Sequence, residues 1–283
     1  MRVSPPARSS VHVAPRFRIA ASCFILFGCA DTSWSIPHPS TQGDLQNAVA
    51  YGYQPLDPAP VKVTLEGQCG SILDALPDET MRMAIGKVDA SGNITFGPAS
   101  LSAANGRYMV IIDYVKSDTK PIFIIRSENE DSTIKITPLS EQKRNDANMA
   151  VPVYVGVGMR LTANLTTREA NIDLGNLVAI GAAAQANTLS GTMVIQTLGV
   201  SGENISTALP IPNDISMASI QNSIQSLGTM KAKLYDTTKT TIHPRVVGLY
   251  NNLGGGRETV NRFISTVFTT PIELKVPASA CPS

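Results

Sequence analysis

The pattern of apolar and polar positions predicts β structure in the first half of the folded region. Between Val61 and Pro138, short runs of apolar and β-branched residues are separated by turn residues such as Lys116–Lys120. Strands at this spacing are typical of a small sandwich or barrel. Tyr108–Asp113 is almost continuously apolar, so we expect it at the centre of a sheet. The expected strands are 61–65, 81–88, 93–96, 108–115, 121–126 and 133–137.

The spacing of apolar residues changes after the polar segment Glu141–Ala150. Apolar residues alternate from Val153 to Leu161, with Gly156 and Gly158 in the opposite phase. This predicts a long strand whose glycine side is closely approached by a helix backbone. Further on we expect helices at 174–186, 217–235 and 258–268 and strands at 191–200 and 240–250, with Pro244 placing the last strand at a sheet edge or a bulge.

The fold class predicted from these patterns is α+β. A β-rich, sandwich-like domain at 61–140 is followed by an α/β domain at 150–283, in which helices pack on a sheet. Before both domains, residues 29–60 are rich in proline and small polar residues. Such a composition buries too little apolar area to offset the entropy of ordering, so we interpret this segment as a tether.

The first 28 residues have the pattern of an export signal. Arg2, Arg8, Arg16 and Arg18 precede an uncharged run, Ile19–Gly28, and no acid accompanies them. A membrane-spanning helix needs about 20 apolar residues, whereas the centre of a secretory signal needs about 7–15. The run is therefore long enough for export and too short to span a bilayer.

Leu26-Phe27-Gly28-Cys29 resembles the lipobox of bacterial lipoproteins. The resemblance implies that Cys29 is acylated and becomes the new N-terminus, and that two or more acyl chains, at about 0.8 kcal/mol per buried CH₂, hold the protein on a membrane. Because Ala30, not an aspartate, follows Cys29, the resemblance also implies the outer membrane, with the protein facing the periplasm. The alternative is an ordinary secreted protein in which Cys29 has no role.

Charge and cysteine content narrow the functional classes. Of 23 basic residues, four lie in the signal, which leaves 19 against 22 acids and a net charge near −3. The basic residues are scattered among acids, and this excludes nucleic-acid binding, which needs a clustered basic face. In an oxidising compartment we expect Cys69 and Cys281 to form a disulfide that ties the start of the folded region to its end.

Few residues offer catalytic chemistry. His243 is the one histidine after the tether, which excludes a multi-histidine metal site and leaves one base for a serine or cysteine nucleophile. Cys69 could serve as a nucleophile, but we favour its role as a half-cystine. The loop Gly254, Gly255, Gly256 and Arg257 precedes an expected helix and is a candidate anion or ligand site, although it lacks the lysine and Ser/Thr of a phosphate loop. We predict no catalytic residue, metal or cofactor.

Together these features predict a lipid-anchored cell-envelope protein that binds other macromolecules. The expected role is a structural or assembly subunit of an envelope or secretion complex, with the membrane and envelope proteins as partners. Two alternatives stay open. One is an envelope hydrolase that uses His243, and the other is a lipoprotein that binds a small ligand or glycan through the glycine loop.

Overall fold

A computed structural model describes most of the chain beyond residue 51. The described residues are 52–67, 70–97, 102–103, 105–129, 133–207, 209, 213–236, 238–254 and 256–278. They belong to one of the two compact units of the chain, Ile36–Ser283. The predicted signal and four residues of the predicted sites, Cys29, Cys69, Gly255 and Cys281, lie outside the described residues.

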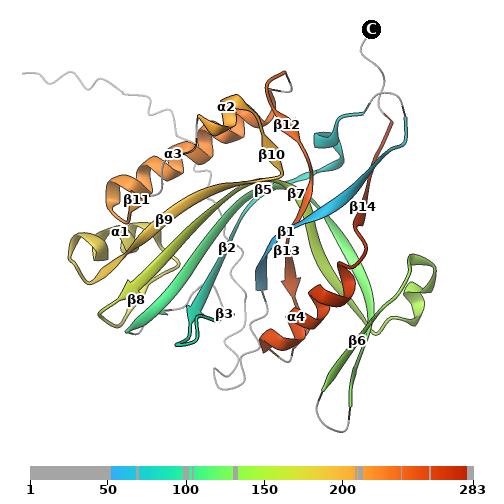
Figure 1. Ribbon diagram of the computed structural model, residues 1–283, viewed down its shortest axis with the longest axis horizontal. Helices are drawn as coiled ribbons and strands as arrows, with labels where there is room; N and C mark the ends of the chain where they lie inside the picture. Colours follow the sequence, from blue (N-terminus) through green and yellow to red (C-terminus); the bar gives the residue numbers. More distant parts are fainter. Residues whose placement is uncertain are drawn as a thin grey trace, which may run out of the picture. The chain divides into compact units, whose positions relative to one another are not determined.

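One large sheet dominates the described structure (Figure 1). Its main path has the order β14-β1-β13-β7-β5-β2-β3; β6 pairs with β5, while β9 pairs with β7 and β11. The pairings are antiparallel except that of β1 with β14, which is parallel. The strands are β1 (Gly52–Leu65), β2 (Asp78–Val88), β3 (Ile94–Gly97), β5 (Gly106–Glu128), β6 (Ile134–Pro138), β7 (Met149–Thr167), β9 (Leu189–Leu198), β11 (Asn213–Asp214), β13 (Arg245–Asn251) and β14 (Ile272–Val276).

Two short ribbons and six helical segments complete the described elements. β4 (Ser102–Ala103) pairs with β8 (Ile172–Asp173), and β10 (Val200–Ser201) pairs with β12 (Thr241–Ile242). The helical segments are η1 (Ile72–Ala75), η2 (Glu141–Asp146), α1 (Leu177–Gln185), α2 (Glu203–Ser206), α3 (Met217–Leu234) and α4 (Gly256–Val267). No helix in the described ranges is both long and apolar enough to cross a membrane.

The three helices expected from the sequence are confirmed as α1, α3 and α4. The side chain of Asn176 accepts hydrogen bonds from the first backbone N–H groups of α1, and Ser216 and Ser219 form a capping box at the start of α3. α3 buries Ile220, Leu227 and other residues at helical spacing. α1 and α3 pack together, α3 contacts β7 and α4 contacts β6, so the mixed fold with helices packed on a sheet is confirmed.

The strands of the two predicted domains pair in one sheet. β5 from the first segment and β7 from the second are paired from Gly106 and Thr167 to Ile124 and Met149. β1, at the start of the described chain, pairs with β13 and β14 near its end. The boundary placed between 140 and 150 therefore separates strands that hydrogen-bond to each other.

The predicted turn at Lys116–Lys120 is wrong, because β5 is continuous through it. These residues pair one by one with Val157 to Val153 of β7, and Ser117 is buried. The expected central position of Tyr108–Asp113 is confirmed, since β5 lies between β7 and β2.

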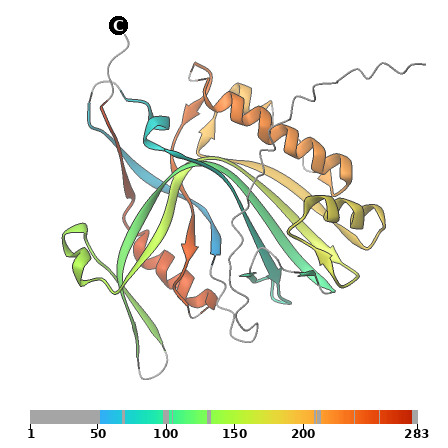
Figure 2. The same ribbon diagram turned by 180° about the vertical axis from the view of Figure 1, so that it is seen from behind.

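The sequence predicts a helix backbone against the glycines of β7, but this prediction is wrong. In the structure these glycines lie against a strand. A Cβ atom on Gly158 would lie 1.9 Å from the carbonyl oxygen of Tyr114, and one on Gly156 would lie 2.3 Å from that of Lys116, both in β5. These glycines let the two long strands approach closely where they arch together (Figure 2).

The sheet extends into the predicted tether. β1 begins at Gly52 and contains Pro55, Pro58 and Pro60. These prolines are tolerated because residues 52–60 pair only with β13, and the pairing register shifts between Pro55 and Ala59. Pro244 lies between β12 and β13, and β13 is interior, between β1 and β7, with a register shift between Val246 and Gly248.

Candidate functional site

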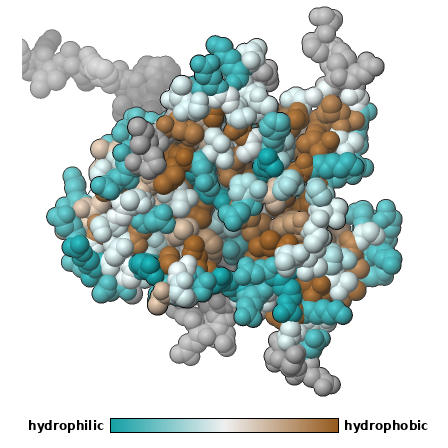
Figure 3. Space-filling view, in the orientation of Figure 1, coloured by the Kyte–Doolittle hydropathy of each residue, from teal (hydrophilic) through white to brown (hydrophobic). Residues whose placement is uncertain are grey.

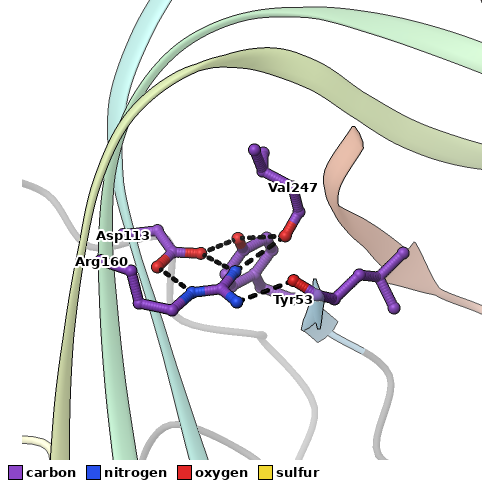
Figure 4. A network of polar contacts seen from close by, with 5 residues as sticks. Tyr53, Asp113, Arg160 and Val247 are labelled. Atoms are coloured by element: carbon purple, nitrogen blue, oxygen red, sulfur yellow. Dashed lines mark hydrogen bonds and ion pairs between the residues drawn. The ribbon is translucent and has the colours of Figure 1, made fainter. Parts of the chain in front are cut away.

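A buried ion pair lies in the middle of the sheet, on the side of β7 opposite to the apolar row Val153–Leu161. Asp113 of β5 and Arg160 of β7 are register partners and are 0% and 4% exposed. The guanidinium donates to both carboxylate oxygens, from Nε to Oδ1 and from Nη2 to Oδ2, each at 2.7 Å. This is the two-pronged geometry that makes arginine–carboxylate pairs strong (Figure 4).

Arg160 also donates to two backbone carbonyls at irregular points of neighbouring strands. Nη1 donates to Leu56 O at 2.7 Å, and Nη2 donates to Val247 O at 2.9 Å. Leu56 lies in the register shift of β1, and Val247 lies in that of β13. The arginine therefore supplies hydrogen bonds where the strand pairing is interrupted, and it ties β1 and β13 to β7.

Tyr53 joins this network, and its ring lies next to that of Tyr154, with centroids 5.8 Å apart. Tyr53 Oη donates to Asp113 Oδ2, and burial, followed by the negative charge of Asp113, raises the pKa of Tyr53 well above its usual value. Burial lowers the pKa of Arg160, but its hydrogen bonds to Asp113 outweigh that effect and raise it. Beside them, the Arg82 guanidinium lies 3.7 Å from the ring centroid of Tyr154. Asp113 is fully paired, so it offers no free base, and the network is a cross-brace of the sheet.

A cavity of about 480 Å³ lies beside this network. Arg160 is among its lining residues, as are Gly256 and Arg257 of the predicted glycine loop. Gly254 does not line it; its positive φ of 71° instead fits a tight turn before α4. The structure therefore brings two of the predicted ligand residues to a concave surface.

A second polar cluster joins β2 to α3. The carboxylate of Glu79 accepts hydrogen bonds from Tyr114 Oη at 2.7 Å and Tyr235 Oη at 2.9 Å, and Lys231 Nζ lies 2.5 Å from it. Partial burial raises the pKa of Glu79, but the bonds from Lys231 and the two tyrosines outweigh it and lower the pKa to about 2. Burial, together with the bond to Glu79, raises the pKa of Tyr114.

His243 lies apart from both clusters. Its side chain is exposed and lines a hollow of about 470 Å³ together with Ser201 and Arg245. Its backbone N–H donates to Gly199 O at 2.8 Å, and its imidazole has no hydrogen-bond or ion-pair partner among the described residues. No assembled base–nucleophile pair is seen at His243 in that part of the chain.

The segments flanking the two predicted half-cystines run side by side. The N–H of Glu66 donates to Val276 O at 2.9 Å, and a Cβ atom on Gly67 would lie 2.5 Å from the Cβ of Ala278. These residues stand just before Cys69 and Cys281 in the sequence. The disulfide itself stays a prediction, because both cysteines lie outside the described residues.

The sequence patterns do not single out four residues of these clusters, which are Tyr53, Asp113, Arg160 and Glu79. A usable signal existed for two of them, because Asp113 and Arg160 each place a charge inside or next to an apolar strand. A charge expected at a buried position needs a partner, but the sequence does not show which residue supplies it.

Comparison with known proteins identifies no relative. No protein-family model, curated protein or solved structure matches this chain.

Proposed function

We propose that this protein is a lipid-anchored cell-envelope protein whose folded unit acts as a structural or assembly subunit of an envelope or secretion complex. The observation that carries the proposal is the sequence up to Cys29, with its arginines, its short apolar run and the Gly28-Cys29 pair. Acylation at Cys29 would hold the folded unit at a membrane surface, on a tether that ends where β1 begins at Gly52.

Three structural features favour binding over catalysis. The buried charges Asp113 and Arg160 are used to brace the sheet, and the imidazole of His243 stands without a polar partner in the described residues. Edge strand β14 pairs with β1 on one side and with no described strand on the other. An open edge can accept a strand from a partner protein.

The distribution of hydrophobic residues on the surface also supports binding of a partner through a strand edge. On the face shown in Figure 3, hydrophobic residues lie in several separate patches interrupted by hydrophilic ones. A large obligate interface would present a broader apolar area, so on this face a strand-addition contact is the better model.

Membrane fractionation and cross-linking test the proposal. The full chain, expressed with its own signal in a bacterium that processes lipoproteins, should sediment with membranes, and Cys29→Ser should release it. A photo-crosslinking residue at exposed Lys275 of β14 should capture one envelope protein in stoichiometric yield, whereas the same residue at exposed Lys143 of η2 should not. A wild-type chain found free of membranes, or equal capture from both positions, would contradict it.

A further inference from the structure

The cavity beside Arg160 has the size of a small-molecule site. Its volume of about 480 Å³ falls within the range of roughly 300–1,000 Å³ that is usual for ligand pockets. It lies between the start of β1, the β2–β3 hairpin and the first turns of α4, and Met109 and Ile111 of β5 also line it. Ile111 stands in the same strand phase as Asp113, so the cavity and the buried network share one side of the sheet.

The walls of this cavity are chemically divided. Apolar side chains come from β3, β5 and α4, and they are Ile94, Phe96, Met109, Ile111, Val260 and Ile264. Polar side chains stand around them, including Asn93, Asn251 and Asn261. A molecule with an apolar body and one polar end would match both parts.

Arg160 supplies a buried donor at the cavity wall. A guanidinium carries five N–H groups, and four of those on Arg160 are used by Asp113, Leu56 and Val247. Tyr53 Oη also lies within hydrogen-bond reach of this guanidinium, beside Asp113 Oδ2 and Val247 O, the two acceptors of Nη2. Within the described residues, Nη1 donates to Leu56 O alone, which leaves its second N–H without an acceptor. Because this side chain is only 4% exposed, a ligand oxygen in the cavity would complete its hydrogen bonding.

Arg257 adds a second positive group at the rim. Its exposed guanidinium makes no ion pair with a described residue. It lies at the N-terminal turn of α4, where unpaired backbone N–H groups also favour an anion. Among the lining residues that the structure describes, Asp57 is the one acid, and it is exposed.

We propose that this cavity binds a small amphipathic carboxylate. The carboxylate accepts hydrogen bonds from the fifth N–H of Arg160 and from Arg257, and the apolar body packs against Phe96, Ile111 and Ile264. This site is separate from the β14 edge and does not depend on the lipid anchor, so either proposal can fail while the other stands.

Isothermal titration with decanoate tests the site. The chain from position 29 onward, with Cys29→Ser, avoids both the lipid and the detergent that would compete for an amphiphile. We expect saturable one-to-one binding of decanoate and roughly tenfold weaker binding of decan-1-ol, which has the same chain but lacks the negative charge.

Three variants locate the binding. Arg257→Gln should weaken decanoate binding by roughly tenfold, and Ile264→Trp should abolish it by filling the cavity. Lys143→Gln, which removes an exposed charge on η2, should leave it unchanged. No saturable binding of decanoate, equal binding of decan-1-ol, or binding unaffected by both cavity variants would each overturn the proposal.

Discussion

At the scale of single residues, the stability of this sheet depends on charges placed inside it. Asp113 and Arg160 would each be costly to bury alone, but they meet in a pair with geometry that satisfies both carboxylate oxygens. Arg160 further satisfies carbonyls at two register shifts. The pair is therefore a structural centre that connects β1, β13, β7 and β5.

Removing one member of this pair should be strongly destabilising. Asp113→Ala leaves the Arg160 guanidinium buried and uncompensated, which costs about 3–5 kcal/mol of unfolding free energy. Urea unfolding followed by circular dichroism measures the change. The double variant Asp113→Leu/Arg160→Met should recover part of the loss; a single variant as stable as wild type would show that the pair does not carry this role.

The Glu79 cluster should make stability sensitive to acid. The pKa of Glu79 is lowered to about 2 in the folded protein from an ordinary 4.5, so its contribution is present above pH 4.5 and is lost as the pH falls toward 2. Glu79→Gln removes this linkage. Thermal unfolding between pH 6 and pH 2 should therefore show a steeper loss of Tm for wild type than for the variant, and parallel curves would contradict the assignment.

At the scale of elements, close approach between β5 and β7 depends on residues without a side chain. Gly158→Ala would place a Cβ atom 1.9 Å from a backbone oxygen of β5, and we expect a loss of about 1–3 kcal/mol. Gly228→Ala on the exposed side of α3 meets nothing within 4 Å, and it should stabilise by about 0.5–1 kcal/mol. Urea unfolding of both variants compares them, and equal effects would contradict the packing of β7.

Helices were easier to predict than strand boundaries for a physical reason. α3 is encoded by its own apolar spacing and its serine cap, which are local features. The continuity of β5 through Lys116–Lys120 depends on a distant partner. The polar residues alone predict a turn, but their pairing with β7 keeps them in a strand. In the structure Lys120 and Asp118 form a 2.5 Å ion pair along the same strand.

At the scale of the whole molecule, the sheet joins the two ends of the described chain. β1 pairs with β13 and β14, so the membership of the sheet could not be predicted from local patterns, which do not encode partners distant in sequence. The cavity was only partly foreseen for the same reason. Gly256 and Arg257 stood out by sequence, whereas Arg160 and Phe96 reach the cavity through the fold.

β1 and β14 pair near the two predicted half-cystines, so the predicted disulfide tests whether these two ends of the folded chain lie together. Alkylation of the unreduced protein should leave Cys69 and Cys281 unmodified, and peptide mapping should find them linked. Cys69→Ala should lower unfolding free energy by about 2–5 kcal/mol, and Cys281→Ala should have no further effect in the double variant. Alkylation of both thiols without reduction would contradict the bond.

The central claim is that Cys29 is the lipid-bearing N-terminus of the mature protein. Mass spectrometry of the N-terminal peptide, from protein made with its own signal in a bacterial host, tests it most directly. The account predicts a peptide that begins at Cys29 and carries acyl chains on that residue. An unmodified Cys29 peptide, or a mature chain that begins elsewhere, would contradict it.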